Sequence, residues 1–310
     1  MSDTTPANVA ADLTNELRRV MPGIPDEDLP RFLAAVTTPG PYSPAAEATV
    51  CDDVPRGRLL ERRFVSRSVF PGVERDVRVY IPPSTRPDAL HALMVFQDGS
   101  RYLGPEVGIA GVFDNLIAAM DIPPTVGLFV EPGETGPGLP IYGGAGNRSI
   151  EYDSLGDAYS RFLINELIPE TTSGIAIPDN PQCRAIVGLS SGGICAFNAA
   201  WERPDYFGKV ISHCGSFVDI RGAHVLPANV RRQPRKRLRI FLQTGEHDLD
   251  ILFGSWLLGN RALASALEYR GYDYKLIVGQ GGHSLAHGGA IISETLRWLW
   301  RDWKDSRSIA

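Results

Sequence analysis

The feature of this sequence that most constrains the fold is a strand–turn–helix corner centred on Ser190. An apolar run at 184–187 ends in Gly188, Ser190 follows two residues later, Gly192 comes two after that, and a helix-compatible run continues the chain. A serine on so sharp a turn has a strained backbone and a projecting hydroxyl, and the glycines avoid a clash across the corner. The spacing predicts Ser190 as a nucleophile and the Ser191 N–H as an oxyanion donor. The alternative is an ordinary Gly/Ser-rich loop.

The elements around this corner indicate an α/β fold. Predicted helices alternate with predicted strands after an antiparallel start, which favours a mostly parallel sheet covered on both faces. Strands are expected at 58–69, 75–81, 92–96, 125–130, 209–213, 238–243 and 274–278. Helices are expected at 106–120, 153–170, 255–270 and 288–303. The Gly/Pro-rich loop at 131–150 is long for a compact fold, and we interpret it as a binding loop.

One domain with an N-terminal extension is predicted. We expect residues 1–55 to form a helical extension and strap, with one helix at 4–20 and a second that is capped by Asp26 and runs through 32–36. Residues 56–310 form the catalytic domain. We expect the extension to pack against the core or to make a homodimer contact, rather than to take part in catalysis.

Composition excludes several classes of partner. The chain has 310 residues, a formal net charge of -5 and a sequence pI of about 5.7, so neither nucleic acid nor an anionic membrane is expected as a partner. No apolar run reaches the length of a membrane span. The N-terminus lacks the pattern of a secretory signal. The four cysteines show neither C-x-x-C nor zinc spacing, so we expect reduced structural thiols, no metal and a cytoplasmic location.

A serine hydroxyl needs a base, and His283 is the candidate. It follows the predicted strand 274–278 in a glycine-rich loop, and the carboxyl ends of parallel strands are where such folds place their sites. His287 is the rival candidate for the base, and we expect it in the substrate site rather than on a metal. Although H-x-x-x-H can hold a metal on a helix, the glutamate of H-E-x-x-H is absent and the flanking glycines disfavour a helix.

The third member should be a carboxylate that orients the imidazole, and Asp248 is the first choice. It follows the predicted strand 238–243, and the order Ser190, Asp248, His283 is that of an α/β-hydrolase. Asp250 and Glu246 are the alternatives, as is an acidic loop without a catalytic role.

A second oxyanion donor is expected where the strand 92–96 ends. The segment Gln97-Asp98-Gly99-Ser100 turns at a glycine, so the Ser100 N–H is placed to meet that of Ser191. An ordinary Asp-Gly turn is the alternative.

The sequence resembles the enterochelin-esterase-like, or esterase D-like, branch of the α/β-hydrolases over residues 59–303. The matching segments are RVYIP at 78–82, FQDG at 96–99, NRSIEY at 147–152, GLSSGG at 188–193, ERPDYF at 202–207 and GGH at 281–283. The resemblance implies an eight-stranded, mostly parallel sheet. It also implies nucleophile, acid and base at Ser190, Asp248 and His283, and oxyanion donors at Ser100 and Ser191.

In such proteins the segment matching Arg148, Glu151 and Tyr152 lies beside the site, so these residues, with Gln97 and Asp98, are candidates for substrate binding. A buried Arg–Glu pair that braces the loop is the structural alternative. Two departures concern the substrate. The sequence shows no basic patch that would hold a triply anionic ferric siderophore, and the extension lies outside the resemblance.

Together these patterns predict a serine carboxylic-ester hydrolase that forms an acyl-enzyme on a small-molecule ester, with no cofactor. Two alternatives stay open: acyl transfer to a sugar or alcohol, and a non-catalytic binding protein on a hydrolase scaffold.

Overall fold

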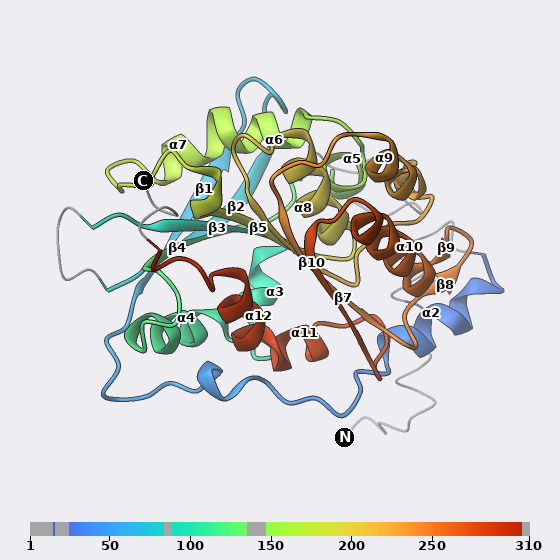
Figure 1. Ribbon diagram of the computed structural model, residues 1–310, viewed down its shortest axis with the longest axis horizontal. Coiled ribbons are helices and arrows are strands. Elements are labelled where there is room, and N and C mark those ends of the chain that lie inside the picture. Colours follow the sequence, from blue (N-terminus) through green and yellow to red (C-terminus); the bar gives the residue numbers. More distant parts are fainter. Residues whose placement is uncertain (1–14, 16–24, 84–88, 135–146, 306–310) are drawn as a thin grey trace.

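A single twisted sheet organises the molecule (Figure 1). The computed structural model describes residues 15, 25–83, 89–134 and 147–305. The eight strands of this sheet are β1 (Arg58–Val65), β2 (Glu74–Ile81), β3 (Ala92–Gln97), β4 (Thr125–Val130), β5 (Arg184–Leu189), β6 (Lys209–His213), β7 (Arg239–Gly245) and β10 (Asp273–Gly279). Their order is β1-β2-β4-β3-β5-β6-β7-β10, with β2 antiparallel to both of its neighbours and every other pair parallel. The predicted eight-stranded, mostly parallel α/β-hydrolase sheet is confirmed.

Helices cover both faces of the sheet, because the central strands are apolar on both faces. In β3, Val95 packs into one core while Met94 and Phe96 pack into the other, and all three are fully buried. The first core is closed by α6 (Ala158–Phe162), α8 (Ser191–Glu202), α9 (Leu226–Arg232) and α10 (Trp256–Tyr269). The second is closed by α3 (Gly99–Leu103), α4 (Ile109–Ala118) and α12 (Ile292–Leu299).

Some predicted elements are divided or shifted in the structure. The helix expected at 153–170 starts at Ala158, passes through a π-helical turn at Leu163–Leu167 and ends as α7 (Ile168–Thr171). The last helix is split into α11 (Ala286–Ala290) and α12. The expected helix at 4–20 lies outside the described residues apart from residue 15, and the loop at 131–150 is described only at 131–134 and 147–150, where α5 (Arg148–Tyr152) begins.

The described part of the N-terminal extension packs against the rest of the chain. It begins with α2 (Asp28–Val36), whose N-cap is Glu27 rather than Asp26. The strap then follows the lower side of the molecule in Figure 1 to β1. A short 3-10 helix at Ala46–Ala48 lies against α4, where the Asn115 side-chain amide donates to the carbonyls of Glu47 and Thr49. Packing against the core is therefore one use of this segment.

Candidate active site

Ser190 lies at the tight corner between β5 and α8. Its φ of 60° and ψ of -122° place it in a strained backbone region, and the N–H groups of Gly193 and Ile194 donate to its carbonyl oxygen. A methyl group added at Gly188 would come within 2.0 Å of the Gly192 carbonyl oxygen. Only glycine therefore fits two residues before the serine, and the predicted strand–turn–helix corner is present.

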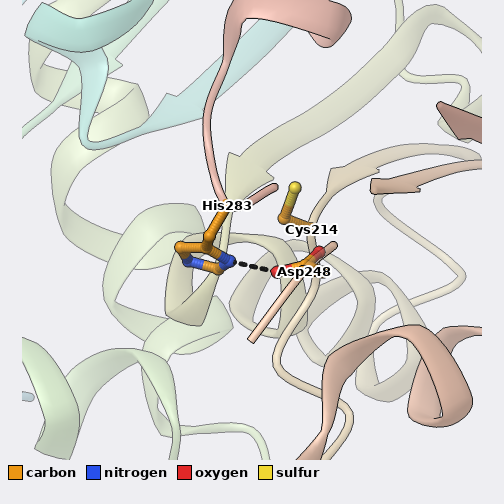
Figure 2. A group of neighbouring side chains, drawn as sticks. All are labelled: Cys214, Asp248 and His283. Carbon is orange, nitrogen blue, oxygen red and sulfur yellow. Dashed lines mark hydrogen bonds and ion pairs between the residues drawn. The ribbon is translucent and has the colours of Figure 1, made fainter. Parts of the chain in front are cut away.

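A carboxylate and an imidazole meet beside this corner, at the carboxyl ends of neighbouring strands. His283 Nδ1 lies 2.6 Å from Asp248 Oδ1 (Figure 2). Asp248 Oδ1 also accepts the Leu249 N–H, and Oδ2 accepts the Thr244 hydroxyl at 2.7 Å. Burial raises the pKa of Asp248, but the His283 imidazole and these hydrogen bonds outweigh burial and hold that pKa below its ordinary value.

This arrangement fixes the histidine tautomer. An ionised Asp248 accepts the Nδ1 proton of His283, which leaves Nε2 as the basic nitrogen. Asp250, the alternative acid, is exposed on the short strand β8 (Asp250–Ile251).

Cys214 is the third member of the cluster in Figure 2, and its potential ligand atom lies within 4.8 Å of those of Asp248 and His283. Burial raises the pKa of the Cys214 thiol well above its ordinary value, so the thiol form is favoured. Its sulfur lies 3.9 Å and 3.8 Å from the carbonyl oxygens of Gly282 and Ser284. His283 Nδ1 bonds to Asp248 and the Cys214 sulfur approaches two carbonyl oxygens, so the three groups form a hydrogen-bonded cluster.

Ser190, Ser191 and His283 line one cleft of about 370 Å³. The Ser190 hydroxyl lies 3.3 Å from that of Ser216, which accepts the indole N–H of Trp256 at 3.0 Å. The Trp256 ring in turn packs edge-on against His283, with 6.0 Å between centroids. The structure thus brings the predicted nucleophile and base to one cavity, and adds Ser216 and Trp256, which no local motif indicates.

The second predicted oxyanion donor is engaged elsewhere. The Ser100 N–H donates to Glu131 Oε1 at 2.6 Å, and Ser100 is not among the residues that line the cleft. Ser191 does line it, and its N–H belongs to the first turn of α8, where amides have no partner within the helix. Of the two donors, the geometry keeps Ser191 available.

Asp98 and Arg148 form an ion pair at the cleft. Arg148 donates from Nε and Nη2 to the two Asp98 carboxylate oxygens at 3.0 and 2.7 Å, and both residues line the cavity. Burial lowers the pKa of Arg148, but the Asp98 carboxylate outweighs burial and raises it above its ordinary value. Arg148 therefore stays charged.

Three of the predicted substrate-binding residues lie in the core instead. Gln97 is fully buried and accepts the Tyr159 hydroxyl, and Tyr152 is buried behind Asp98, whose N–H it accepts. Glu151 forms a two-pronged ion pair with Arg75 at 2.6 and 2.9 Å, and both side chains are fully buried. The predicted Arg–Glu brace is present, but its arginine is Arg75 rather than Arg148.

This pair leads to a prediction about stability. Glu151→Gln keeps the shape of the side chain but leaves Arg75 buried without its counter-charge, so we expect a loss of about 3–5 kcal/mol in the free energy of unfolding. The matched control is Glu74→Gln, which removes the exposed Arg63–Glu74 pair and should cost less than about 1 kcal/mol. Urea unfolding measures both; equal losses would contradict the assignment of Glu151 as a structural brace.

His287 also lies away from the cleft. Its ring stacks on Tyr42 of the strap at 4.2 Å, and the Gln243 amide nitrogen lies 3.2 Å from its Nδ1. Burial lowers its pKa, which favours the neutral ring. His287 is placed to hold the strap rather than to touch a substrate.

Comparison with known proteins identifies the family of this chain. Residues 68–298 match the family described as "Putative esterase". The chain is 26% identical over 242 residues to an iron(III) enterobactin esterase of Dickeya dadantii, a match that covers 73% of this chain and 52% of that protein. It therefore spans about half the length of that relative. It is 25% identical over 250 residues to the uncharacterized protein YjcH of Bacillus subtilis, covering 78% and 97% of the two chains.

Solved structures show the same fold. A ferulic acid esterase superposes with a TM-score of 0.62 at 18% identity, covering 79% of this chain and 99% of that one. The enterochelin esterase of Shigella flexneri superposes with a TM-score of 0.66 at 21% identity, covering 85% and 63%. Among the helices of the described residues, none combines the length and apolar character needed to cross a bilayer. With three quarters of its length inside the family match, the chain belongs to this esterase family, as its resemblance to enterochelin-esterase-like proteins predicted.

Proposed function

We propose that the protein is a serine carboxylic-ester hydrolase that works through an acyl-enzyme on Ser190. The observation that carries the proposal is the cleft that Ser190 shares with His283, whose Nδ1 is held by the Asp248 carboxylate at 2.6 Å. Together these are a nucleophile, a base and the group that orients the base.

The chemistry follows from this arrangement. His283 Nε2 takes the Ser190 proton as Ser190 Oγ attacks the ester carbon, and the Ser191 N–H stabilises the oxyanion that forms. The imidazolium then protonates the leaving alkoxide, which leaves an acyl-Ser190. A water molecule, deprotonated by His283, attacks the acyl group and releases the acid with the free Ser190 hydroxyl. No step needs a metal or organic cofactor.

Ser216 has a positioning role in this proposal. Because an indole N–H can only donate, Ser216 Oγ accepts from Trp256, and its own proton is free to donate to Ser190 Oγ. Ser190 then keeps its own proton for His283. The Ser190 hydroxyl bonds to Ser216 in this structure, and a Ser190–His283 hydrogen bond is expected to form when substrate binds, because such bonds are often long in apo active sites.

Ser216→Ala is therefore expected to lower kcat by about tenfold, equivalent to ~1.4 kcal/mol for one hydrogen bond, with KM little changed. The matched control is Ser212→Ala, which removes a buried serine hydroxyl that has no hydrogen-bond partner among the described residues. Steady-state kinetics on a p-nitrophenyl ester, together with the rate of fluorophosphonate labelling, provide the measurement. An unchanged kcat, or an equal loss in both variants, would remove Ser216 from the mechanism.

The cleft favours an ester without a large net charge. Its acidic lining residues, Asp98 and Glu106, match its two arginines, Arg101 and Arg148, in number. A polyanionic ferric siderophore would need more cationic than acidic side chains in the cleft. We propose a small-molecule ester of low charge as substrate. The free thiols, among them the exposed Cys51, support the proposed cytoplasmic location.

Product analysis tests hydrolysis against the acyltransferase alternative. The protein is incubated with a p-nitrophenyl ester, with and without a competing alcohol or sugar. Hydrolysis predicts free acid as the main product in both mixtures. A transferred ester that dominates once the acceptor is present would favour the transferase, and no turnover in either mixture would favour a binding protein.

A further inference from the structure

The N-terminal extension lies directly against the loop that carries the base. The backbone N–H of His283 donates to the Ala35 carbonyl at the end of α2, at 2.9 Å. The backbone N–H of Gly282 donates to the Thr38 carbonyl, at 2.6 Å. A methyl group at Gly282 would lie 2.1 Å from the Ala35 oxygen, so the glycine is what lets the two backbones approach. The position of His283 is thus fixed partly by a segment outside the residues that match the esterase family.

The other end of α2 is fixed as well. The buried Asp28 carboxylate accepts the Leu252 N–H at 2.8 Å, in the turn between the short strands β8 and β9 (Gly254–Ser255). Figure 1 shows α2 beside these strands. Leu29 and Ala35 join a small separate core with Val218, Leu249, Ile251 and Trp256. These contacts hold α2 at both ends and along one side, so the helix is firmly packed against the rest of the molecule.

One face of α2 lines the active-site cleft. Phe32 and Val36, four residues apart and therefore on one helix face, line the same cavity as Ser190 and His283. Further apolar side chains complete this part of the lining: Ile220, Leu249, Ile251, Phe253 and Trp256. The charged lining residues come from other segments, at 98–106 and 148. The cleft therefore has an apolar part in which α2 supplies two side chains, and such a surface binds hydrocarbon by removing it from water.

We propose that Phe32 and Val36 are specificity-determining residues that bind an apolar group of the substrate, an aryl or extended alkyl group on one side of the ester bond. The inference rests on the proposed function, since it concerns the substrate of the same site. It assigns to α2 a direct part in substrate selection.

The test compares wild type with Phe32→Ala on two ester series. The first lengthens the acyl group, from p-nitrophenyl acetate to butyrate and octanoate; the second enlarges the alcohol, from methyl to phenyl and naphthyl acetate. In one series, the ratio of kcat/KM for the largest ester to that for the smallest should fall by about tenfold or more. The affected series shows whether the acyl or the alcohol group lies against α2.

Arg31→Ala is the matched control, because Arg31 is exposed on the same helix and absent from the cleft lining. It should leave the ratio in both series unchanged. If Phe32→Ala fails to fold, judged by Tm, Val36→Phe takes its place. It narrows the apolar part of the cleft and should also lower the ratio for the largest ester.

Two results for the test variant would overturn the inference. An equal loss of kcat/KM for every ester in both series would make α2 only a structural support. Unchanged kcat/KM values throughout would show that its side chain does not contact the substrate. Fluorophosphonate labelling of wild type separates this failure from that of the proposed function. A labelled Ser190 with unchanged ratios removes only the role of α2, whereas an unlabelled Ser190 removes the nucleophile itself.

Discussion

Ser190→Ala is expected to lower kcat for p-nitrophenyl esters by about ten-thousandfold or more, with Tm within a few degrees of wild type. Removing a nucleophilic serine eliminates the acyl-enzyme route, and only the weak catalysis from the remaining site groups stays. The structure should tolerate the change because the strained corner depends on the glycine at 188 and on hydrogen bonds from backbone groups to the carbonyl oxygen of residue 190. Steady-state kinetics and a thermal melt measure the two effects.

The control for this variant is Ser212→Ala, a serine-to-alanine change at a buried position of β6 (Lys209–His213). It should keep turnover close to that of wild type. Substantial activity in purified Ser190→Ala would contradict the assignment of the nucleophile.

Asp248→Asn is expected to lower kcat by about a thousandfold to ten-thousandfold. An amide presents no charge to the imidazolium, and its NH₂ group can donate to His283 Nδ1, which selects the wrong tautomer. The Thr244 hydroxyl can still donate to the remaining carbonyl oxygen and hold the new side chain in place, so the loss should be mainly in kcat rather than in folding.

The neighbouring Asp250→Asn is the matched control, because its carboxylate is exposed and His283 Nδ1 bonds to Asp248 instead. It should change kcat by less than about threefold. A large loss in Asp250→Asn with a small one in Asp248→Asn would reverse the assignment that the geometry supports.

The fold was largely predictable because its information is local. Strands such as 125–130 and 209–213 are short apolar runs bounded by turn residues, and the structure has them at the same residues as predicted. The corner at Ser190 was predictable for a related reason, since two glycines at fixed spacing report a close approach within a few residues.

Contacts between distant segments were not predictable in this way. The sequence indicated a buried Arg–Glu brace, but the chain neighbour Arg148 turns to Asp98 while Glu151 reaches Arg75 on β2. Likewise, the turn at 97–100 suggested a free Ser100 N–H, and only the fold shows that the end of β4 brings Glu131 to it. In both cases the partner comes from a segment that the arrangement of the strands brings close, and no local sequence pattern indicates such a contact.

The extension shows the same limit. Its Pro-rich composition indicated a strap, which suits packing. That Phe32 and Val36 reach the cavity of Ser190 depends on the turn between β8 and β9, some two hundred residues later, which holds Asp28. The Gly281-Gly282 pair was the available signal: it reported a close backbone approach without saying which segment approaches.

The most direct test of the central claim, that Ser190 is activated by His283, is site-resolved labelling with a fluorophosphonate, followed by peptide mass spectrometry. The account predicts one phosphonylated residue in the wild type, Ser190, with labelling abolished in Ser190→Ala and strongly slowed in His283→Ala. A label on another residue, or equal labelling rates with and without the imidazole, would contradict it.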